Sequence, residues 1–298
     1  MKCKIAVVIL NYMSYEDTLA CIECALNQKG EGYEIIVVDN GSENDSYGIL
    51  KKEYESVANI TLLRLEKNEG FAKGNNYGIH YAREKFKADY IFVCNSDVTF
   101  TEDLFESALA LQTKGIGAIS PPVYDSDGNP QPISITTNHI YLKIINIITQ
   151  LIITWLTYLP GIDKLYQIYQ HRKKGRPDKE KKAEQDKAKA VNWNPNKYNL
   201  QGCAFFLTTE FFKYYEQLYP KTFLYWEEIN LIVYLSKAHL QAVIKELPVV
   251  IHKGKKSTKH LIKDKAYEKK RLEYSTKSMI KSLPMFFRSY VYILAKYN

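Results

Sequence analysis

Short apolar runs alternate with longer mixed stretches through the first hundred residues. Four of these runs are rich in β-branched residues and are expected to form buried strands, at residues 4–10, 34–38, 60–65 and 89–94. The stretches between them are expected to form helices, at residues 15–28, 42–54 and 72–86. Because parallel strands need crossover connections, this alternation predicts an α/β fold with a mostly parallel, Rossmann-like sheet flanked by helices.

Each predicted strand runs directly into polar residues, and the fourth is the most informative. Ile91-Phe92-Val93-Cys94 is followed by Asn95-Ser96-Asp97. Ligands of open α/β sheets gather at the carboxyl ends of strands. Asp97, with Asn95 beside it, could hold a hard divalent cation whose other ligands are phosphate oxygens and water. The alternative is that Asn95 and Asp97 only cap a helix beginning near Thr101.

Two common nucleotide-binding motifs are missing from the sequence. A dinucleotide-binding fold would place G-x-G-x-x-G after the first strand, where this chain has Asn11-Tyr12-Met13-Ser14. The chain also has no P-loop. A nucleotide would therefore have to be bound by a motif other than these two.

Four segments at the strand ends, in order, resemble the motifs of family 2 glycosyltransferases with the GT-A fold. They are residues 7–12 (VVILNY), 37–42 (VVDNGS), 68–76 (NEGFAKGNN) and 95–98 (NSDV). The third is similar to the rhamnosyltransferase-like branch. The resemblance returns over residues 200–207, 223–228 and 250–254, so that it covers about residues 1–130 and 191–258.

The resemblance implies a role for each matching residue. Asp97 and His252 would bind Mg²⁺ or Mn²⁺, and the donor nucleotide would contact a larger set: Asn11, Tyr12, Asp39, Asn68, Gly70, Phe71, Lys73, Asn75 and Asn95. Asp39 would accept a hydrogen bond from a pyrimidine N–H. Three simpler alternatives stay open: Asp39 in an Asx turn, Lys73 on the surface, and His252 as an ordinary strand-end histidine.

An acidic pair, Glu227-Glu228, opens a predicted helix. Negative charge is favoured there by the helix dipole alone. The resemblance instead implies that Glu228 is the general base, with Glu227 as the second choice. The family usually has Asp at the second position and a third carboxylate two residues later, where this chain has Glu228 and Asn230. This departure admits a weakened or inactive enzyme.

The function that the resemblance implies is an inverting, metal-dependent glycosyltransferase. It would move a sugar from a pyrimidine nucleotide donor, dTDP-rhamnose or a UDP-hexose, to a saccharide or lipid-linked saccharide in cell-surface polysaccharide synthesis. One alternative is a non-catalytic, membrane-associated subunit that binds nucleotide sugars. A sugar nucleotidyltransferase is disfavoured because the first strand lacks a glycine-rich loop ending in Arg and Lys.

The segments without a motif match divide the chain. We expect a nucleotide-sugar-binding half at residues 1–135, a helical insertion at 136–190, an acceptor-binding half at 191–258 and a helical extension at 259–298. The insertion holds an amphipathic helix at 141–159 and a basic segment at 172–189. This pair suits either peripheral contact with a membrane or packing on the core or on a twin subunit. The extension is expected to form two helices, at 260–276 and 278–297.

Composition and charge narrow the expected partners and location of the protein. The 298 residues carry a formal charge of +8, which suits anionic headgroups, and no nucleic-acid partner is expected. The five cysteines are odd in number and scattered, so they favour reduced thiols in a cytoplasmic protein, with the inner face of the cell membrane as a site of peripheral contact. The chain opens with Lys2-Cys3-Lys4 rather than a secretory signal. A homo-oligomer is left open.

Overall fold

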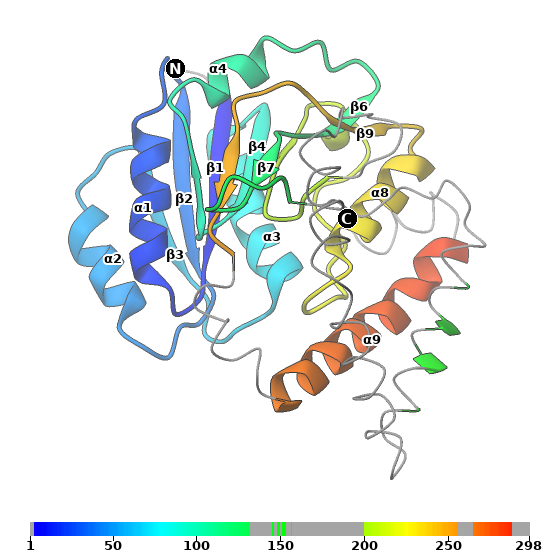
Figure 1. The fold of residues 1–298 in the computed structure, drawn as a ribbon. Coiled ribbons are helices and arrows are strands. Elements are labelled where there is room, and N and C mark those ends of the chain that lie inside the picture. The colour runs from blue at the N-terminus through cyan, green and yellow to red at the C-terminus, as the bar shows by residue number, and fades with distance from the viewer. Residues whose placement is uncertain are drawn as a thin grey trace.

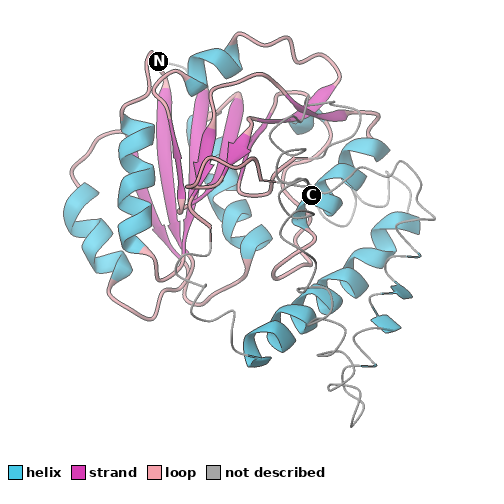
Figure 2. Ribbon diagram, viewed as in Figure 1, coloured by secondary structure: helices cyan, strands magenta, loops and turns pink. Residues whose placement is uncertain are grey.

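The computed structural model describes residues 3–131, 200–254 and 265–287, together with six helical positions between residues 145 and 156. The predicted basic segment at 172–189 lies outside these residues, as do the ends of the two helices predicted for the C-terminal extension. Figures 1 and 2 show a central sheet with helices on both sides, and a long helix lying apart from it.

The central sheet has seven strands in the order β3-β2-β1-β4-β8-β6-β9. Their bounds are β1 (Ile5–Asn11), β2 (Tyr33–Asp39), β3 (Ile60–Arg64), β4 (Tyr90–Asn95), β6 (Ile116–Ser120), β8 (Ala204–Leu207) and β9 (Gln241–Ile244). The first four are parallel, and β8 runs antiparallel to both β4 and β6. The predicted α/β fold with a mostly parallel sheet is confirmed.

Alternate residues of β1 enter two separate cores. Ile5, Val7 and Ile9 pack on one side of the sheet with helices α1 (Tyr15–Leu26), α2 (Ser46–Tyr54) and α4 (Leu104–Leu109). Ala6 and Val8 pack on the other side with α3 (Phe71–Tyr81) and α8 (Glu227–Lys237). Because both faces are covered, the strands read as continuous apolar runs rather than as alternating ones. We call the second set the α3-side core.

A second, three-stranded sheet lies at the end of the first. It contains β5 (Val98–Phe100), β7 (Val123–Tyr124) and β10 (Val250–His252) in the order β5-β10-β7. The antiparallel pairing of β10 with β5 sets His252 opposite Val98, and the N–H of Lys253 donates to the carbonyl of Asp97 at 2.9 Å. This small sheet therefore brings Asp97 and His252, which are far apart in the sequence, together at the tip of β4.

In the described part of the C-terminal extension, one helix runs across the point where two helices were expected to meet. Helix α9 (Lys265–Phe287) continues through residue 277 and contains Pro284 near its end. Met279, Met285 and Phe286 are buried in the α3-side core. The break was predicted at a point with no Gly or Pro, and the burial of Ser278 and Met279 favours continuous helix there.

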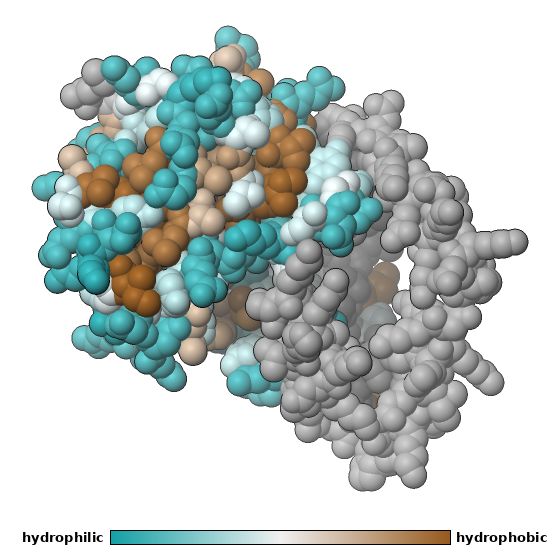
Figure 3. All heavy atoms as spheres, turned by 60° about the vertical axis from the view of Figure 1, so that its left-hand side comes forward, coloured by the Kyte–Doolittle hydropathy of each residue, from teal (hydrophilic) through white to brown (hydrophobic). Residues whose placement is uncertain are grey.

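Only a few positions of the predicted amphipathic helix are described. Leu151 packs against the α3-side core, whereas Ile145, Ile148 and Ile152 are exposed. Among the helices in the described parts of the chain, none combines the length and apolarity that a bilayer crossing demands. On the face that Figure 3 brings forward, hydrophobic residues form several patches separated by hydrophilic ones.

Candidate active site

The polar ends of the parallel strands lie side by side. The strand register pairs Asn11 with Asp39 and Asp39 with Arg64, so these three residues form a row across β1, β2 and β3. On the other side of β1, Asn95 pairs with Leu10. The prediction that ligand-facing residues gather at one edge of the sheet thus has a geometric basis. Arg64 ends its strand but belongs to none of the motifs, so the sequence does not mark it as a site residue.

Asn11 connects the tips of β1 and β2. Its Nδ2 donates to Asp39 Oδ2 at 2.7 Å, and its Oδ1 accepts a hydrogen bond from Thr18 Oγ1 at 2.8 Å. Asp39 Oδ1 accepts from the backbone N–H of Ser42 at 3.0 Å, which forms the Asx turn that the sequence left open. Asn11 is 0% exposed and Asp39 1%. Both side chains therefore serve the internal structure of this edge.

Two neighbours of this buried pair face outward. Tyr12, the residue after β1, is 40% exposed. The Arg64 side chain is half exposed, lies 3.7 Å from Asp39 Oδ1 through its Nε, and covers the ring of Tyr47 at 4.9 Å. An aromatic ring and a guanidinium over a buried carboxylate offer stacking and hydrogen bonding to a planar ligand.

The loop at residues 68–71 is held by Asn40, which sequence reasoning passed over although it follows Asp39 directly. Asn40 Nδ2 donates to Asn68 Oδ1 at 3.1 Å and to the carbonyl of Gly70 at 3.2 Å. Gly70 has a φ of 87°, and a Cβ there would come within 2.2 Å of the carbonyl oxygen of Phe223. The N–H of Phe71 donates to that same oxygen at 2.8 Å. Glycine is needed at 70 because its φ is positive and because a Cβ would clash with the carbonyl of Phe223.

The remaining residues predicted from this motif lie on α3. Lys73 is exposed and pairs with Glu69 at 2.9 Å, in keeping with the surface alternative. A Cβ at Gly74 would meet the side chains of Leu10 and Asn40, so this glycine lets the helix approach β1 and β2 closely. Asn75 is buried, and its Nδ2 donates to the carbonyl of Phe71 at 3.0 Å.

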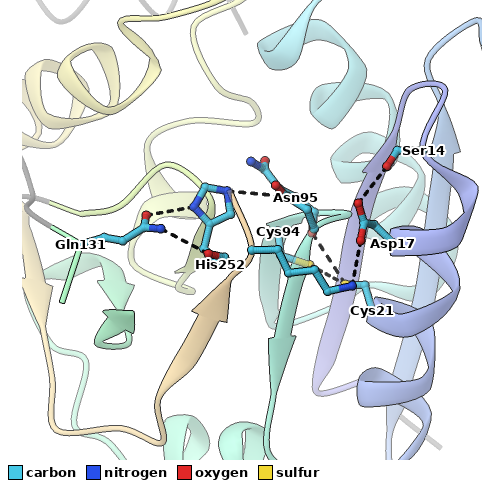
Figure 4. A network of polar contacts seen from close by, with 9 residues as sticks. Ser14, Asp17, Cys21, Cys94, Asn95, Gln131 and His252 are labelled. Carbon is cyan, nitrogen blue, oxygen red and sulfur yellow. Dashed lines mark hydrogen bonds and ion pairs between the residues drawn. The ribbon is translucent and has the colours of Figure 1, made fainter. Parts of the chain in front are cut away.

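Asp97 and His252 lie together at the tip of β4, and Figure 4 shows the ring of His252 beside Gln131. His252 Nε2 is 3.2 Å from Asp97 Oδ1, and both side chains are partly exposed. His252 Nδ1 lies 2.9 Å from Gln131 Oε1, while Gln131 Nε2 donates to the backbone carbonyl of His252 at 3.3 Å. Gln131 was not predicted, because nothing in the sequence connects it with a residue 121 positions later.

The contacts of Gln131 determine which nitrogen of the His252 ring carries the proton. The backbone carbonyl of His252 can only accept, so the amide NH₂ of Gln131 faces it and Oε1 faces the ring. Nδ1 of His252 must then be the donor, which leaves the lone pair of a neutral ring on Nε2, toward Asp97. Asp97 Oδ1 and an unprotonated Nε2 are both acceptors, so at 3.2 Å they need a proton or a cation near them.

A divalent cation fits these residues, provided that the substrate supplies ligands. Within the described ranges, no group of three or more His, Cys, Asp or Glu side chains is arranged to hold a metal ion. Asp97 and His252 offer one oxygen and one nitrogen, and Mg²⁺ commonly takes only one or two carboxylates and completes its shell with phosphate and water. The donor set therefore suits a metal that binds together with a diphosphate.

Lys253 and Asp17 form an ion pair beside this site. Lys253 Nζ is 2.7 Å from Asp17 Oδ1, and Ser14 Oγ donates to Asp17 Oδ2 at 3.2 Å. This contact joins the end of β10 to the first turn of α1.

The acidic pair begins α8, and Glu228 lies directly on Gly202. A Cβ at Gly202 would come within 2.3 Å of Glu228 Oε1. The adjacent Cys203 carbonyl accepts the N–H of Asn95 at 2.9 Å, so Glu228 stands next to the end of β4. Burial raises the pKa of the Cys203 thiol, and so do the negative charges of Asp97 and Glu228. The base candidate and the metal candidate therefore share one site.

The two carboxyl groups of the acidic pair differ in their surroundings. Burial, followed by the charge of Glu228, raises the pKa of Glu227 to about 8. Among the described residues, Glu227 Oε1 has no hydrogen-bond partner. Burial also raises the pKa of Glu228, but hydrogen bonds from the backbone at Glu228 and Gly202 oppose this. The pair therefore favours a protonated Glu227 beside an ionised Glu228.

Beneath the site lies a pair of thiols. Cys21 Sγ and Cys94 Sγ are 3.8 Å apart, and all five cysteines of the chain are free. Burial raises the pKa of the Cys94 thiol well above its usual range. These are the properties of unreactive, packing cysteines.

The sheet, its polar edge and the acidic pair define a GT-A type α/β protein. Residues 6–162 match the family described as Glycosyl transferase family 2, and the chain belongs to this family. The rhamnosyltransferase-like branch stays a prediction.

Two curated relatives resemble part of the chain. One is the low-salt glycan biosynthesis hexosyltransferase Agl10 of Haloferax volcanii, 28% identical over 127 residues, which are 42% of this chain and 38% of the relative. The other is the glycosyltransferase GlyG of Streptococcus pneumoniae, 30% identical over 129 residues, which are 42% of each protein. The chain thus spans well under half the length of either relative.

A solved structure supports the fold. The mannosyltransferase PcManGT of Pyrobaculum calidifontis, in complex with GDP-Man and Mn²⁺, matches all of this chain and 77% of its own. The TM-score is 0.54 and the identity 12%. At this identity the likeness concerns the fold alone.

Proposed function

We propose that the chain is an inverting glycosyltransferase that moves a sugar from a nucleoside diphosphate sugar to a saccharide or lipid-linked saccharide. The observation that carries the proposal is the convergence of Asp97, His252 and Glu228 at the end of β4, next to the row of strand tips. Membership of the family supports it, as do the names of the two relatives.

The donor nucleotide lies along the edge formed by the tips of β1, β2 and β3. Tyr12 stacks on the base, and the Arg64 guanidinium lies beside it, because both side chains are exposed next to the buried Asp39. The loop at residues 68–71 covers the sugar-phosphate part. We propose a pyrimidine donor, dTDP-rhamnose or a UDP-hexose, because residues 37–42 and 68–76 resemble motifs of the family, the second of them in its rhamnosyltransferase-like form.

Asp97 and His252 would hold Mg²⁺ or Mn²⁺ beside the diphosphate. When bound, such an ion supplies neutralisation of the negative charge that develops on the leaving group. Gln131 places a proton on Nδ1 of His252 and directs Nε2 at this position, and the backbone N–H of Lys253 fixes Asp97 through its carbonyl.

Glu228 acts as general base. It takes the proton of the acceptor hydroxyl while that oxygen forms a bond to the anomeric carbon, on the face opposite the diphosphate. The bond from the anomeric carbon to the phosphate oxygen breaks, and the nucleoside diphosphate leaves with its electron pair. The configuration at the carbon is inverted. Glu227, held protonated by burial and by its neighbour, leaves the negative charge to Glu228.

Two measurements test the proposal. Thermal unfolding with dTDP, UDP or GDP, each with and without Mn²⁺, should show stabilisation by a pyrimidine nucleotide that depends on the metal, because a ligand that binds only the folded state raises Tm. Donor turnover should then be lost in Glu228→Gln while nucleotide binding persists. Metal-dependent binding without any turnover in the wild type would support the non-catalytic alternative instead.

A further inference from the structure

The segment that leads into the acidic pair has an unusual backbone. Tyr225 and Trp226 are consecutive and both lie in the left-handed region, with φ values of 70° and 76°. This conformation costs a residue with a side chain about 1 kcal/mol or more, so two in succession persist only when their surroundings enforce them. Glu227 and Glu228 follow at once as the first turn of α8.

The residues that hold this strained backbone lie on one face of α9. Four of its residues contact the segment 219–226, and they recur at helical spacing: Tyr274, Ser275, Ser278 and Lys281. Positions separated by three or four residues share a helix face. We call these four residues the α9 contact face.

Two of these contacts reach the segment just before the acidic pair. Ser278 Oγ donates to the carbonyl of Leu224 at 2.8 Å, and Trp226 Nε1 donates to Ser275 Oγ at 3.3 Å. The first bond lies just before the strained pair and the second is made by the indole of its second residue, so together they hold the strained backbone against α9.

The other two contacts hold the earlier part of the segment. The ring of Tyr274 stacks on Phe223, with centroids 5.3 Å apart, and Tyr219 Oη donates to the carbonyl of Lys281 at 2.6 Å. Phe223 is also the residue whose carbonyl accepts the N–H of Phe71. The segment is therefore held between α9 and the loop at residues 68–71.

We propose that α9 is a positioning element for the acidic pair. Its contact face holds residues 219–226 in the strained conformation that places Glu228 on Gly202, beside Asp97. Ser275 and Ser278 are the positioning residues, because one hydroxyl accepts from the side chain of Trp226 within the strained pair and the other donates to the carbonyl of Leu224 directly before it. The catalytic consequence rests on the proposed function, in which Glu228 is the base.

A structural alternative is that α9 only stabilises the fold by burying Met279, Met285 and Phe286. The chain offers a matched control for separating the two. Ser282 is also buried on α9, but its hydroxyl donates to the carbonyl of Ser278 within the helix, at 2.8 Å. Ser282→Ala therefore removes a buried serine hydroxyl from the same helix without touching the segment.

Hydrogen exchange, followed by mass spectrometry on the full chain, tests the contact directly. Ser278→Ala should speed amide exchange in residues 219–228 by about three- to tenfold, the range that one net hydrogen bond supports, and leave β1 and β4 unchanged. Ser282→Ala should leave exchange in residues 219–228 unchanged. Equal exchange in residues 219–228 of Ser278→Ala and the wild type would overturn the proposal.

Kinetics test the catalytic consequence. Ser278→Ala should lower kcat by about tenfold or more at unchanged affinity for the donor, whereas Ser282→Ala should keep kcat. Equal loss of kcat in both variants would mean that α9 serves stability alone. If the wild type turns over no donor while Ser278→Ala still loosens residues 219–228, the proposed function fails and the holding role of α9 stands.

Discussion

The carboxylate of Glu228 lies on Gly202 so closely that a methyl group there would come within 2.3 Å of Glu228 Oε1. The obstacle is the end of a flexible side chain, which can turn away at little cost in stability. Gly202→Ala should therefore displace the Glu228 carboxylate and leave the fold intact. We expect kcat to fall by about 100-fold, near the lower limit of what a general base contributes, with donor affinity and Tm close to the wild type.

Gly48→Ala is a control for this variant. A Cβ at Gly48 would come equally close to a carboxylate, Asp45 Oδ1 at 2.3 Å, but on helix α2, on the opposite side of the molecule from α8 in Figure 1. This variant should keep full activity. Normal kcat in Gly202→Ala would argue against Glu228 as the base.

The raised pKa of Glu227 predicts a pH dependence of stability. Its pKa is about 8 in the folded chain, against 4.5 as the ordinary value, so the folded state binds this proton more tightly. The stabilisation is present in full below about pH 4.5 and is lost as the pH rises through about 8. Tm should fall over this window, and Glu227→Gln should make the fall shallower. An identical slope in both proteins would show that Glu227 titrates normally.

Gln131 should control the tautomer of His252. Replacing it by Leu removes the acceptor for Nδ1, so the Nδ1-protonated form should lose its preference, which ¹⁵N chemical shifts of the metal-free protein would report. Mn²⁺ affinity in the presence of nucleoside diphosphate should fall by about 10- to 100-fold, the usual effect of losing a residue that orients a ligand. The exposed Gln241 provides the comparison, and Gln241→Leu should change neither quantity. Unaltered ¹⁵N shifts in Gln131→Leu would contradict the assignment.

Asn11 should contribute to the stability of the fold through its buried hydrogen bonds. Asn11→Ala removes the 2.7 Å partner of the buried Asp39 Oδ2, and Thr18 Oγ1 loses its bond to Asn11 Oδ1 but keeps the carbonyl of Ser14 at 2.8 Å. The loss should be about 2–4 kcal/mol in the free energy of unfolding, measured with urea. Thr18→Val removes one of these bonds and should cost less. A loss under about 1 kcal/mol in Asn11→Ala would mean that water replaces the amide.

The local parts of this fold were readable from the sequence. The four parallel strands and their polar ends follow from apolar runs that stop at residues such as Asn11 and Asp39. Asp97 follows the apolar run that forms β4 and His252 ends the run that forms β10, and both match motifs of the family, so each could be named individually. Their proximity is a result of β10 pairing with β5, which no local pattern encodes.

Contacts between distant segments explain what could not be predicted. Gln131 and Gly202 have no chemical signature of their own, and their importance comes from His252 and Glu228. Asn11 was expected to face the nucleotide, but the register places Asp39 beside it and buries both. The single helix α9 follows from tertiary burial of Ser278 and Met279, in a stretch whose own propensities left the boundary open.

The place of β8 has a consequence for how the chain is made. This strand fills the gap between β4 and β6, yet it is synthesised long after both of them. Until residues 204–207 leave the ribosome, β4 and β6 each present an unpaired edge, which is a template for association with other chains. A nascent chain that stops near residue 131 should therefore depend on chaperones and aggregate when released, although it already contains the row of strand tips.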